Sequence, residues 1–170
     1  MIGQPRVFKD GLTITRATPE DVKAIKTMVD AAYAKYIDRI GKPPAPMTED
    51  YQEVIQSREV FVLREKIKTV GSIVLMYDAD SSSAKIDNLV VDPMSQGRGY
   101  ARVLMEYAEE IANSENLSAL TLYTNVKMYE NLEIYRRMGF EEIGRREEDG
   151  YDRIYFRKNL SKYAGEIKLH

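Results

Sequence analysis

The chain contains no cysteine, so a disulfide framework, a thiolate metal site and a cysteine nucleophile are all excluded. The same absence says little about compartment, because a chain without cysteine is compatible with any redox environment. His170 is the only histidine, and it is also the last residue, where chains tend to fray. Mechanisms that need a histidine base, a Ser-His-Asp triad or a histidine-ligated metal are therefore disfavoured, and we expect no metal site.

Long apolar runs are missing as well. No stretch approaches the ~20 apolar residues of a membrane span, and the first residues lack the apolar core of a signal peptide. The formal net charge is -2, so the composition indicates neither a nucleic-acid binder nor an acidic tail. We expect a cytoplasmic protein with neither nucleic acid nor membrane as a partner.

The residues that are present suit one globular domain. The chain has 170 residues, of which 44% are hydrophobic and 31% charged. A chain of this length buries roughly two thirds of its unfolded surface, so its core needs neither disulfides nor a structural metal. No repeat, linker or low-complexity tract divides it. We therefore expect a single domain over residues 1–170, with a core at about 11–160 and a C-terminal tail, 161–170, that shows no convincing pattern.

Hydrophobic periodicity and turn residues predict an α+β protein. Thr18 is the expected cap of a first helix that begins with Pro19, and Thr48 the expected cap of a short second one. Gly41 and three prolines break the chain between them. A last hairpin turns at "EEDG", residues 147–150. The predicted strands are 11–17, 60–64, 70–77, 85–91, 118–124 and the two arms of 140–160, and the predicted helices are 18–37, 48–57, 100–112 and 128–139.

One junction between a strand and a helix contains residues suited to binding an anion. The segment "VVDPMSQGRGYARVLMEYAEEIA" runs from a strand through a glycine-broken loop into an amphipathic helix. Unpaired N–H groups at a helix start attract anions, and Gly97 and Gly99 present no side chain that would keep an anion away. Arg98 and Arg102 add positive charge. The loop suits a pyrophosphate, although it has neither the P-loop pattern nor the GxGxxG spacing of a dinucleotide fold.

Three features occur here in a fixed order. They are a strand that ends in Val91 and Pro93, the Gln-x-x-Gly-x-Ala spacing from Gln96 to Ala101, and the later "YRRMGF" at 135–140. Together they resemble the GNAT superfamily of coenzyme A-dependent N-acetyltransferases over roughly residues 11–160. The resemblance implies a central, mostly antiparallel mixed sheet of six to seven strands. About four helices flank this sheet, and it is splayed between the fourth and fifth strands.

The resemblance also implies acetyl-coenzyme A as the acetyl donor, with no metal. In this family the pantetheine arm pairs with backbone groups of the strand before the loop, and one N–H, here of Leu89 or Val90, polarises the thioester carbonyl. The amides from Gly97 to Arg102 then hold the pyrophosphate. Arg102, Arg136 or Arg137 is the candidate for the 3′-phosphate. The implied cofactor-binding residues are Leu89, Val90, Val91, Gln96, Gly97, Arg98, Gly99, Tyr100, Ala101, Arg102 and Asn131.

Tyr135 matches the family tyrosine that often protonates the departing thiolate, a role that a phenol held near sulfur can fill. The other interpretation is a core tyrosine whose hydroxyl bonds elsewhere. Many relatives carry asparagine seven residues earlier, where this chain has Met128. Asn131 and Asn125 are the available substitutes, and we prefer Asn131.

The general base is left open. Many relatives use a glutamate on the strand that carries Leu89, but this strand offers no glutamate. Asp87 is a candidate, although a solvated carboxylate is the simpler interpretation of it. Tyr123, or a water chain on backbone carbonyls, is the other option.

The resemblance places the acceptor pocket between the first helical region and the later strands, so residues 31–51 select the substrate. Tyr33 and Tyr36 lie in this segment, and its carboxylates Asp38, Glu49 and Asp50 would attract an amine.

We therefore expect an N-acetyltransferase that moves the acetyl group of acetyl-coenzyme A directly to a primary amine of a small molecule, amino acid or peptide. The absence of cysteine favours a ternary complex over a covalent acetyl-enzyme. The alternative is a non-catalytic sensor that binds acyl-coenzyme A. Oligomeric state is open between a monomer and a homodimer, in which the C-terminal hairpin or tail would pair with a neighbour.

Overall fold

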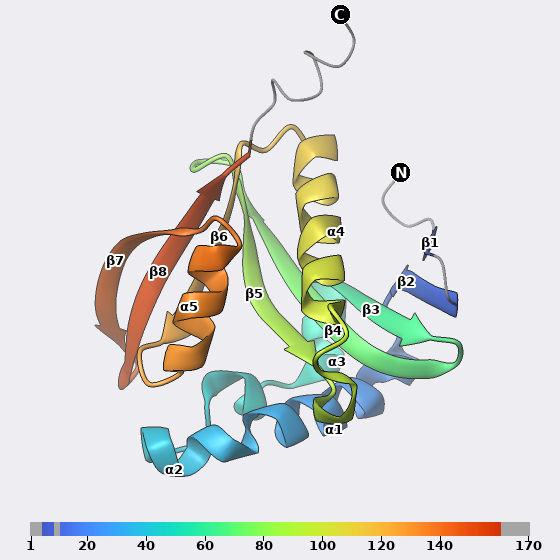
Figure 1. Cartoon of the computed structure of the whole chain (residues 1–170), viewed down its shortest axis with the longest axis horizontal. Coiled ribbons are helices and arrows are strands. Elements are labelled where there is room, and N and C mark those ends of the chain that lie inside the picture. The colour runs from blue at the N-terminus through green and yellow to red at the C-terminus, as the bar shows by residue number, and fades with distance from the viewer. Residues whose placement is uncertain (1–4, 9–10, 161–170) are drawn as a thin grey trace, which may run out of the picture. The chain divides into compact units, whose positions relative to one another are not determined.

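The computed structural model describes residues 5–8 and 11–160 (Figure 1). The expected C-terminal tail and His170 lie outside the described residues. The strands are hydrogen-bonded in the order β1-β2-β3-β4-β5-β6-β8-β7. The chain forms two compact units: unit 1 takes residues up to 76 and 87–107, and unit 2 takes 77–86 and 108 onward. Strand β5 and helix α4 each contribute residues to both.

The helices and strands follow the predicted order. The helices are α1 (Val22–Tyr33), α2 (Ile37–Ile40), α3 (Tyr51–Ser57), α4 (Tyr100–Ser114) and α5 (Tyr129–Arg137). The strands are β1 (Arg6–Val7), β2 (Leu12–Arg16), β3 (Glu59–Glu65), β4 (Lys68–Asp78), β5 (Ser83–Val91), β6 (Ala119–Asn125), β7 (Glu141–Glu148) and β8 (Tyr151–Asn159). Short 3₁₀ turns lie at Pro19–Asp21, Ala34–Tyr36, Ala45–Thr48 and Pro93–Ser95. Among the described residues, no helix is long and apolar enough to cross a membrane.

The predicted fold class is confirmed, but the strand count is wrong. The sheet has eight strands rather than six to seven, and the unpredicted β1 has two residues, too few to show an alternating pattern in sequence. Pairing is antiparallel at β1-β2, β2-β3, β3-β4, β6-β8 and β7-β8, and parallel where β5 meets β6. That parallel register runs from Ser83↔Ala119 to Ile86↔Leu122. The splay expected beyond it stays a prediction.

Unit 1 packs α1 and α3 against its strands. Helix α1 presents Ile25 and Val29, both fully buried, to Val60, Val62 and Val74 of β3 and β4. The predicted start is confirmed. Thr18 caps the 3₁₀ turn that leads into α1, and Pro19 is the first residue of that turn. The N–H of Thr18 donates to the carboxylate of Asp21 at 2.8 Å.

The predicted cap of α3 is wrong. Asp50, rather than Thr48, precedes this helix, and its carboxylate accepts hydrogen bonds from the N–H groups of Gln52 at 3.1 Å and Glu53 at 3.4 Å. Thr48 instead ends a separate 3₁₀ turn, where its hydroxyl donates to the carbonyl of Ala45 at 2.9 Å. The prolines before it hold that turn apart from the helix.

Gly71 of β4 permits a close approach that the sequence did not signal. A Cβ on Gly71 would lie 3.0 Å from Cδ1 of Leu104 on α4 and 3.1 Å from the carbonyl oxygen of Val90 on β5. The carbonyl belongs to strand backbone and cannot move aside cheaply. A glycine at this position therefore sets how closely α4 packs on unit 1.

We expect Gly71→Ala to lower the free energy of unfolding by about 1–3 kcal/mol, because the added methyl group overpacks this contact. Urea denaturation monitored by circular dichroism measures the change. Gly144→Ala is the matched control, since Gly144 also lies in a strand but a Cβ there would meet nothing within 4 Å. Equal losses in both variants would show that the close approach has no special cost.

Unit 2 is built on the β7–β8 hairpin and α5. The hairpin turns within the predicted "EEDG" segment, at Asp149 and Gly150, whose φ angles of 54° and 79° are typical of a two-residue turn. Helix α5 lies on one face of β6 and β8 (Figure 1). Fully buried Phe156 and nearly buried Leu122 point to that face.

Candidate active site

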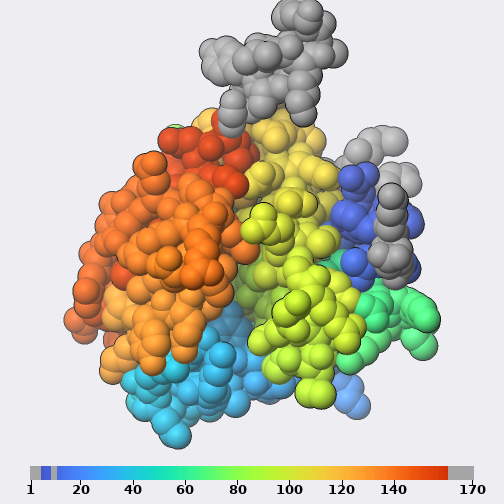
Figure 2. Space-filling model, in the orientation of Figure 1, coloured from blue at the N-terminus to red at the C-terminus, as the bar shows by residue number. Residues whose placement is uncertain are grey.

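The loop between β5 and α4 has the backbone shape that its glycines predict. Gly97 and Gly99 have φ angles of 84° and 80°, in the left-handed region that other residues avoid. A Cβ on either glycine would meet nothing within 4 Å. The loop lies at the surface of the molecule (Figure 2). Both glycines therefore serve the backbone conformation, and the space beside them is open to a ligand.

The start of α4 supplies the donors. Tyr100 is the first helical residue, and the first helical hydrogen bond recorded runs from the N–H of Val103 to the carbonyl of Gly99 at 3.1 Å. The amides that precede Val103 have no acceptor within the helix, and the helix dipole places partial positive charge on them. The geometry suits an anion at this position, and the pyrophosphate cradle of Gly97 to Arg102 stays a prediction.

Two side chains near the loop interact with an acidic residue, Glu65, which the sequence did not indicate. The hydroxyl of buried Tyr100 donates to the carboxylate of Glu65, at the end of β3, and this bond raises the pKa of the tyrosine. Arg98 forms an exposed ion pair with the same carboxylate at 3.5 Å. Gln96 is exposed and reaches back to the carbonyl of Val91 at 3.5 Å. The Tyr100 side chain is therefore engaged with Glu65, and only its backbone is left for the predicted anion site.

We expect Glu65→Gln to tighten coenzyme A binding by about two- to threefold at low salt, because it removes a negative charge beside the loop and releases Arg98. Isothermal titration of coenzyme A measures the affinity, and the gain should shrink as salt is added. Glu20→Gln makes the same change of net charge at an exposed position on another element. An equal gain in that control would assign the effect to net charge alone.

The backbone ladder predicted before the loop lies on β5. Val90 and Val91 are buried, and Val90 packs in the core cluster of unit 1, while Leu89 is half-buried. The side chains of Val90 and Val91 are core residues, as expected, whereas that of Leu89 is only partly covered. The backbone role of Leu89, Val90 and Val91 toward a pantetheine arm stays a prediction.

Tyr135 lies on α5, in unit 2, and the "YRRMGF" segment explains its position. The N–H of Phe140 donates to the carbonyl of Tyr135 at 3.0 Å, and the N–H of Gly139 to that of Arg136 at 3.1 Å. With Gly139 at a φ of 94°, these bonds form a Schellman motif. Such motifs include an apolar contact between the two end positions. Here that contact is between the rings of Tyr135 and Phe140, whose centroids are 6.1 Å apart.

A second ring completes the setting of Tyr135. Phe156 of β8 lies 6.0 Å from it between centroids. The backbone bonds of the Schellman motif fix the position of Tyr135 on the helix, and contacts with Phe140 and Phe156 orient its ring. Gly139 is confirmed as the glycine that ends the helix. The proton-donor role of Tyr135 stays a prediction.

The asparagine substitutes differ in what they already do. Asn125 accepts the N–H of Lys127 at 2.9 Å with its side-chain oxygen, and its carbonyl accepts the N–H of Met128 at 2.9 Å. This turn leads into α5 and occupies the Asn125 side chain. Met128 is buried and packs inside unit 2. Half-buried Asn131, on the first turn of α5, is the asparagine we retain as a cofactor contact.

The arginines considered for the 3′-phosphate lie on exposed helix faces. Arg136 pairs with Glu142 at 3.5 Å, and Arg137 pairs with Glu133 one helical turn earlier at 3.6 Å. Arg102, on the first turn of α4, is exposed. Of the three, only Arg102 belongs to the same unit as the glycine loop.

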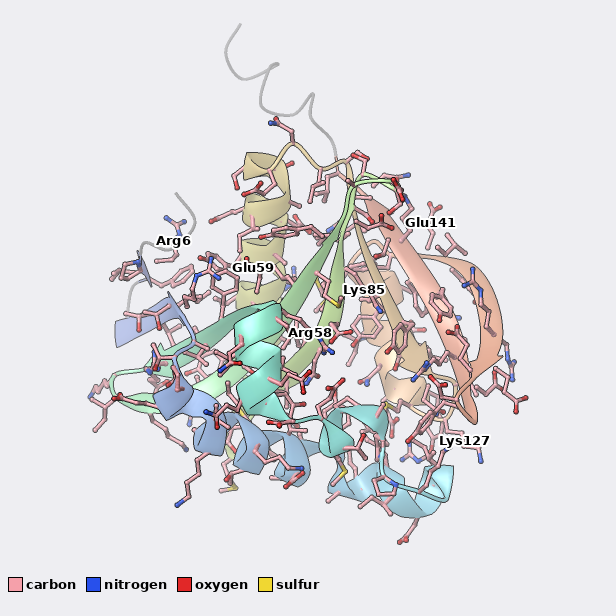
Figure 3. The ribbon with its side chains drawn as sticks, turned by 180° about the vertical axis from the view of Figure 1, so that it is seen from behind. Arg6, Arg58, Glu59, Lys85, Lys127 and Glu141 are labelled. Carbon is pink, nitrogen blue, oxygen red and sulfur yellow. The ribbon has the colours of Figure 1, made fainter. Side chains whose placement is uncertain are left out.

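Asp87 is not the solvated carboxylate expected from the sequence. Its side chain is only 14% exposed, and it pairs at 2.6 Å with Arg58, which is labelled in Figure 3. Arg58 also reaches Glu49 at 3.4 Å. Arg58 therefore holds the Asp87 carboxylate, and the general base stays a prediction that is open among Asp87, Tyr123 and a water chain.

A buried polar chain ties the substrate-selecting segment to β5. The hydroxyl of Tyr33 donates to Oδ1 of Asn88 at 3.0 Å, and Nδ2 of Asn88 donates to the hydroxyl of Tyr51 at 3.2 Å. Tyr51 in turn donates to the carbonyl of Pro46 at 2.7 Å. Burial, followed by nearby Glu49, raises the pKa of Tyr51, so its hydroxyl keeps its proton. Asn88 thus joins α1, α3 and the proline loop, a link that sequence analysis missed.

The carboxylates expected to attract an amine are mostly engaged. Asp50 caps α3 and Glu49 pairs with Arg58, while Asp38 in the first turn of α2 is exposed. Tyr36 is buried, with the cations of Lys35 and Arg39 5.0 Å and 5.2 Å from its ring centroid. Asp38 and Asp50 are both exposed, but Asp50 already caps α3, so Asp38 is the predicted carboxylate for which no such role is seen.

Solved structures identify the fold. The ribosomal-protein-S18-alanine N-acetyltransferase of Escherichia coli superimposes with a TM-score of 0.71 at 21% identity, over 88% of this chain and 94% of that one. The PaiA N-acetyltransferase of Thermoplasma acidophilum, solved in complex with coenzyme A, gives a TM-score of 0.71 at 17% identity. The match covers 88% of this chain and 99% of that one. Both show the GNAT fold.

Sequence relatives identify the family. A family model described as "Acetyltransferase (GNAT) domain" matches residues 56–142, just over half of the chain. A protein named IAA acetyltransferase, from Azospirillum brasilense, is 30% identical over 83 residues, which are 49% of this chain and 54% of that protein. The chain thus spans about half the length of the curated relative it matches.

The chain belongs to the GNAT acetyltransferase family. This membership is the one that the glycine loop and "YRRMGF" indicated. The matched residues, 56–142, include the loop, Asn131 and Tyr135.

Proposed function

We propose that the protein transfers the acetyl group of acetyl-coenzyme A to a primary amine of a small molecule, amino acid or peptide. The observation that carries the proposal is the open glycine loop at the start of α4, in a chain of the GNAT family. Its left-handed glycines and unpaired helix amides suit a pyrophosphate and would serve no purpose in an ordinary turn.

Acetyl-coenzyme A, when bound, supplies an activated acyl group as a thioester. The amides from Gly97 to Arg102 would hold its pyrophosphate, and the backbone of Leu89 to Val91 would align its arm. An N–H of Leu89 or Val90 would stabilise negative charge on the thioester oxygen. Tyr135 would return a proton to the sulfur that leaves. Because the chain has no cysteine, the amine attacks directly in a ternary complex.

The acceptor would meet residues 31–51, which the Asn88 chain ties to β5. This link gives the substrate-selecting segment a defined position relative to Leu89, one residue further along the same strand. The base that removes the amine proton stays open among Asp87, which Arg58 engages, Tyr123 and a water chain.

The test is an acetylation assay of an amine library that follows the release of free coenzyme A. Acetyl transfer to at least one amine, dependent on Tyr135, is the expected result. Cofactor binding without transfer to any amine would favour a sensor that holds acyl-coenzyme A, since Met128 and the absent glutamate depart from the family pattern. Failure of acetyl-coenzyme A to raise the melting temperature would contradict both functions.

A homodimer and a cytoplasmic location are further proposals carried over from the sequence. Light scattering decides the first. The hairpin expected to pair with a neighbour is β7–β8, and the tail expected to do so lies outside the described residues.

A further inference from the structure

Asn88 is a polar side chain in the core of unit 1. It lies on β5, next to Leu89, and only 8% of its surface is exposed. Both ends of its amide are used, since Oδ1 accepts the hydroxyl of Tyr33 and Nδ2 donates to the hydroxyl of Tyr51. A buried amide is costly unless it is hydrogen-bonded, so these partners matter to the fold. Asn88 therefore holds two tyrosines from different helices in one chain of hydrogen bonds.

The direction of each hydrogen bond in this chain is fixed by its last acceptor. The hydroxyl of Tyr51 lies 2.7 Å from the carbonyl oxygen of Pro46, and because a carbonyl can only accept, Tyr51 donates its one proton there. Toward Asn88 the same hydroxyl can only accept, which requires the NH₂ end of the amide. Oδ1 then faces Tyr33, whose hydroxyl donates to it. The chain thus runs in one direction, from Tyr33 to the proline loop, residues 41–48.

Polar contacts hold the same part of the chain at two other points. Nζ of Lys26, on α1, donates to the carbonyl of Met47 at 2.6 Å. Arg58 pairs with Glu49, which follows the loop, at 3.4 Å. The side chains of Lys26 and Arg58 are 40% and 24% exposed, whereas Asn88 is buried. Water therefore competes least for the hydrogen bonds of Asn88, and these define the position of the loop most sharply.

The residues tied in this way belong to the segment expected to meet the acceptor. Tyr33 and Tyr51 lie within residues 31–51, and they share unit 1 with Asn88. Asn88 is followed by Leu89, one of the two residues whose N–H is expected to polarise the thioester. In a direct transfer the amine must approach the reacting carbonyl to about 3–3.5 Å, so a small displacement of the acceptor segment is costly. One side chain thus relates this segment to the backbone that would hold the acyl group.

We propose that Asn88 is a positioning residue for the acceptor. Its amide holds Tyr33, Tyr51 and the proline loop in the arrangement that binds the amine. It acts through the two tyrosines and is not itself a catalytic residue. The inference rests on the proposed function and adds to it a residue that sets the KM for the acceptor. Loss of the chain should weaken acceptor binding and retain both the transfer step and the binding of acetyl-coenzyme A.

The experiment uses Tyr33→Phe and Tyr51→Phe, each of which removes one hydroxyl from the chain and keeps the ring. Steady-state kinetics with the best amine of the library measure kcat and both KM values. We expect the acceptor KM to rise about fivefold or more in each variant, the equivalent of one neutral hydrogen bond. The kcat and the KM for acetyl-coenzyme A should stay within about twofold, because neither variant removes a group that the transfer uses.

Tyr107→Phe is the matched control for a structural effect. Tyr107 is a buried tyrosine of unit 1, 7% exposed, whose ring lies 5.2 Å from that of Phe61 between centroids. It belongs to neither the acceptor segment nor the glycine loop. Loss of a buried hydroxyl should lower the melting temperature of both Tyr107→Phe and Tyr51→Phe, and only Tyr51→Phe should raise the acceptor KM. A merely structural role would reduce the amount of folded enzyme, which lowers the apparent kcat and leaves KM unchanged.

Asn88→Leu removes both hydrogen bonds of the amide at similar volume. The acceptor KM should rise further than in either tyrosine variant. Tyr33→Phe should then add less to Asn88→Leu than it does to the unmodified protein, because the bond that the two residues share is already absent. Fully additive effects would overturn the inference. If Asn88→Leu does not fold, the two tyrosine variants decide it.

Three outcomes contradict the proposal in different ways. Acceptor KM values that stay within about twofold in both tyrosine variants of an active enzyme would overturn the inference and leave the proposed function intact. An equal rise in the KM for acetyl-coenzyme A would also overturn it, because the chain would then support unit 1 as a whole. If the unmodified protein acetylates no amine, the proposed function fails and the inference fails with it.

Discussion

Tyr135→Phe should lower kcat by about 100-fold while largely sparing the affinity for acetyl-coenzyme A, because general acid catalysis of this kind typically contributes 10²–10⁴-fold. The substitution removes one hydroxyl and leaves the ring between Phe140 and Phe156. The Schellman motif that ends α5 depends on backbone atoms and on ring packing, so the fold should be retained. Steady-state kinetics and a melting curve check both expectations.

Tyr129→Phe is the matched control for this variant. Tyr129 begins the same helix and is 60% exposed, so loss of its hydroxyl should change kcat little. A Tyr135→Phe enzyme with unchanged turnover would remove Tyr135 from the mechanism and favour the alternative interpretation of a core tyrosine. A fall in melting temperature together with turnover would instead assign the hydroxyl a structural contact.

Local signals in the sequence predicted the parts of the fold that depend on local geometry. Gly139 and Phe140 define a helix end because only glycine adopts the left-handed conformation there without strain. Asp149 and Gly150 define a hairpin for the same reason. Gly97 and Gly99 were predicted to open the loop to an anion, and their φ angles and open surroundings match that expectation.

Features that join distant parts of the sequence were not predictable in this way. Asn88 hydrogen-bonds to Tyr33 and Tyr51, which lie 55 and 37 residues away along the chain. A polar residue in a strand leaves no periodic sign of such partners. Arg58 changed the interpretation of Asp87 in the same manner, across 29 residues. Local rules compete with one another as well, since Thr48 and Asp50 are both acceptable caps and only the proline-held turn decides between them.

Two arginines of the β7–β8 hairpin show what register adds to sequence. In sequence, Arg145 and Arg146 are two adjacent cations on an exposed strand. The register places them on opposite faces, where one meets Asp152 and the other meets Arg153. The difference between the two arginines, one hydrogen-bonded to Asp152 and one opposite Arg153, exists only after the strands pair.

Gly99→Ala should weaken coenzyme A binding by at least about tenfold, because the loss of even one charge-assisted hydrogen bond from the loop amides costs that much. A Cβ at Gly99 projects into the open space that an anion would occupy, and a φ of 80° strains any residue but glycine. Relaxation of that strain turns the amides away from their present directions. Isothermal titration measures the affinity.

Gly41→Ala is the control that distinguishes the effect of backbone strain from the effect of losing the anion site. Gly41 follows α2 with a φ of 91°, and a Cβ there also meets nothing within 4 Å, so both variants bear the same kind of strain in open surroundings. Both should lose roughly 1 kcal/mol of stability, a shift of about 2–4 °C in melting temperature for a chain of this size. Only Gly99→Ala should lose affinity. Equal affinity in the two variants would mean that the loop before α4 does not hold the pyrophosphate, and the assignment of Gly97 to Arg102 would then fail with it.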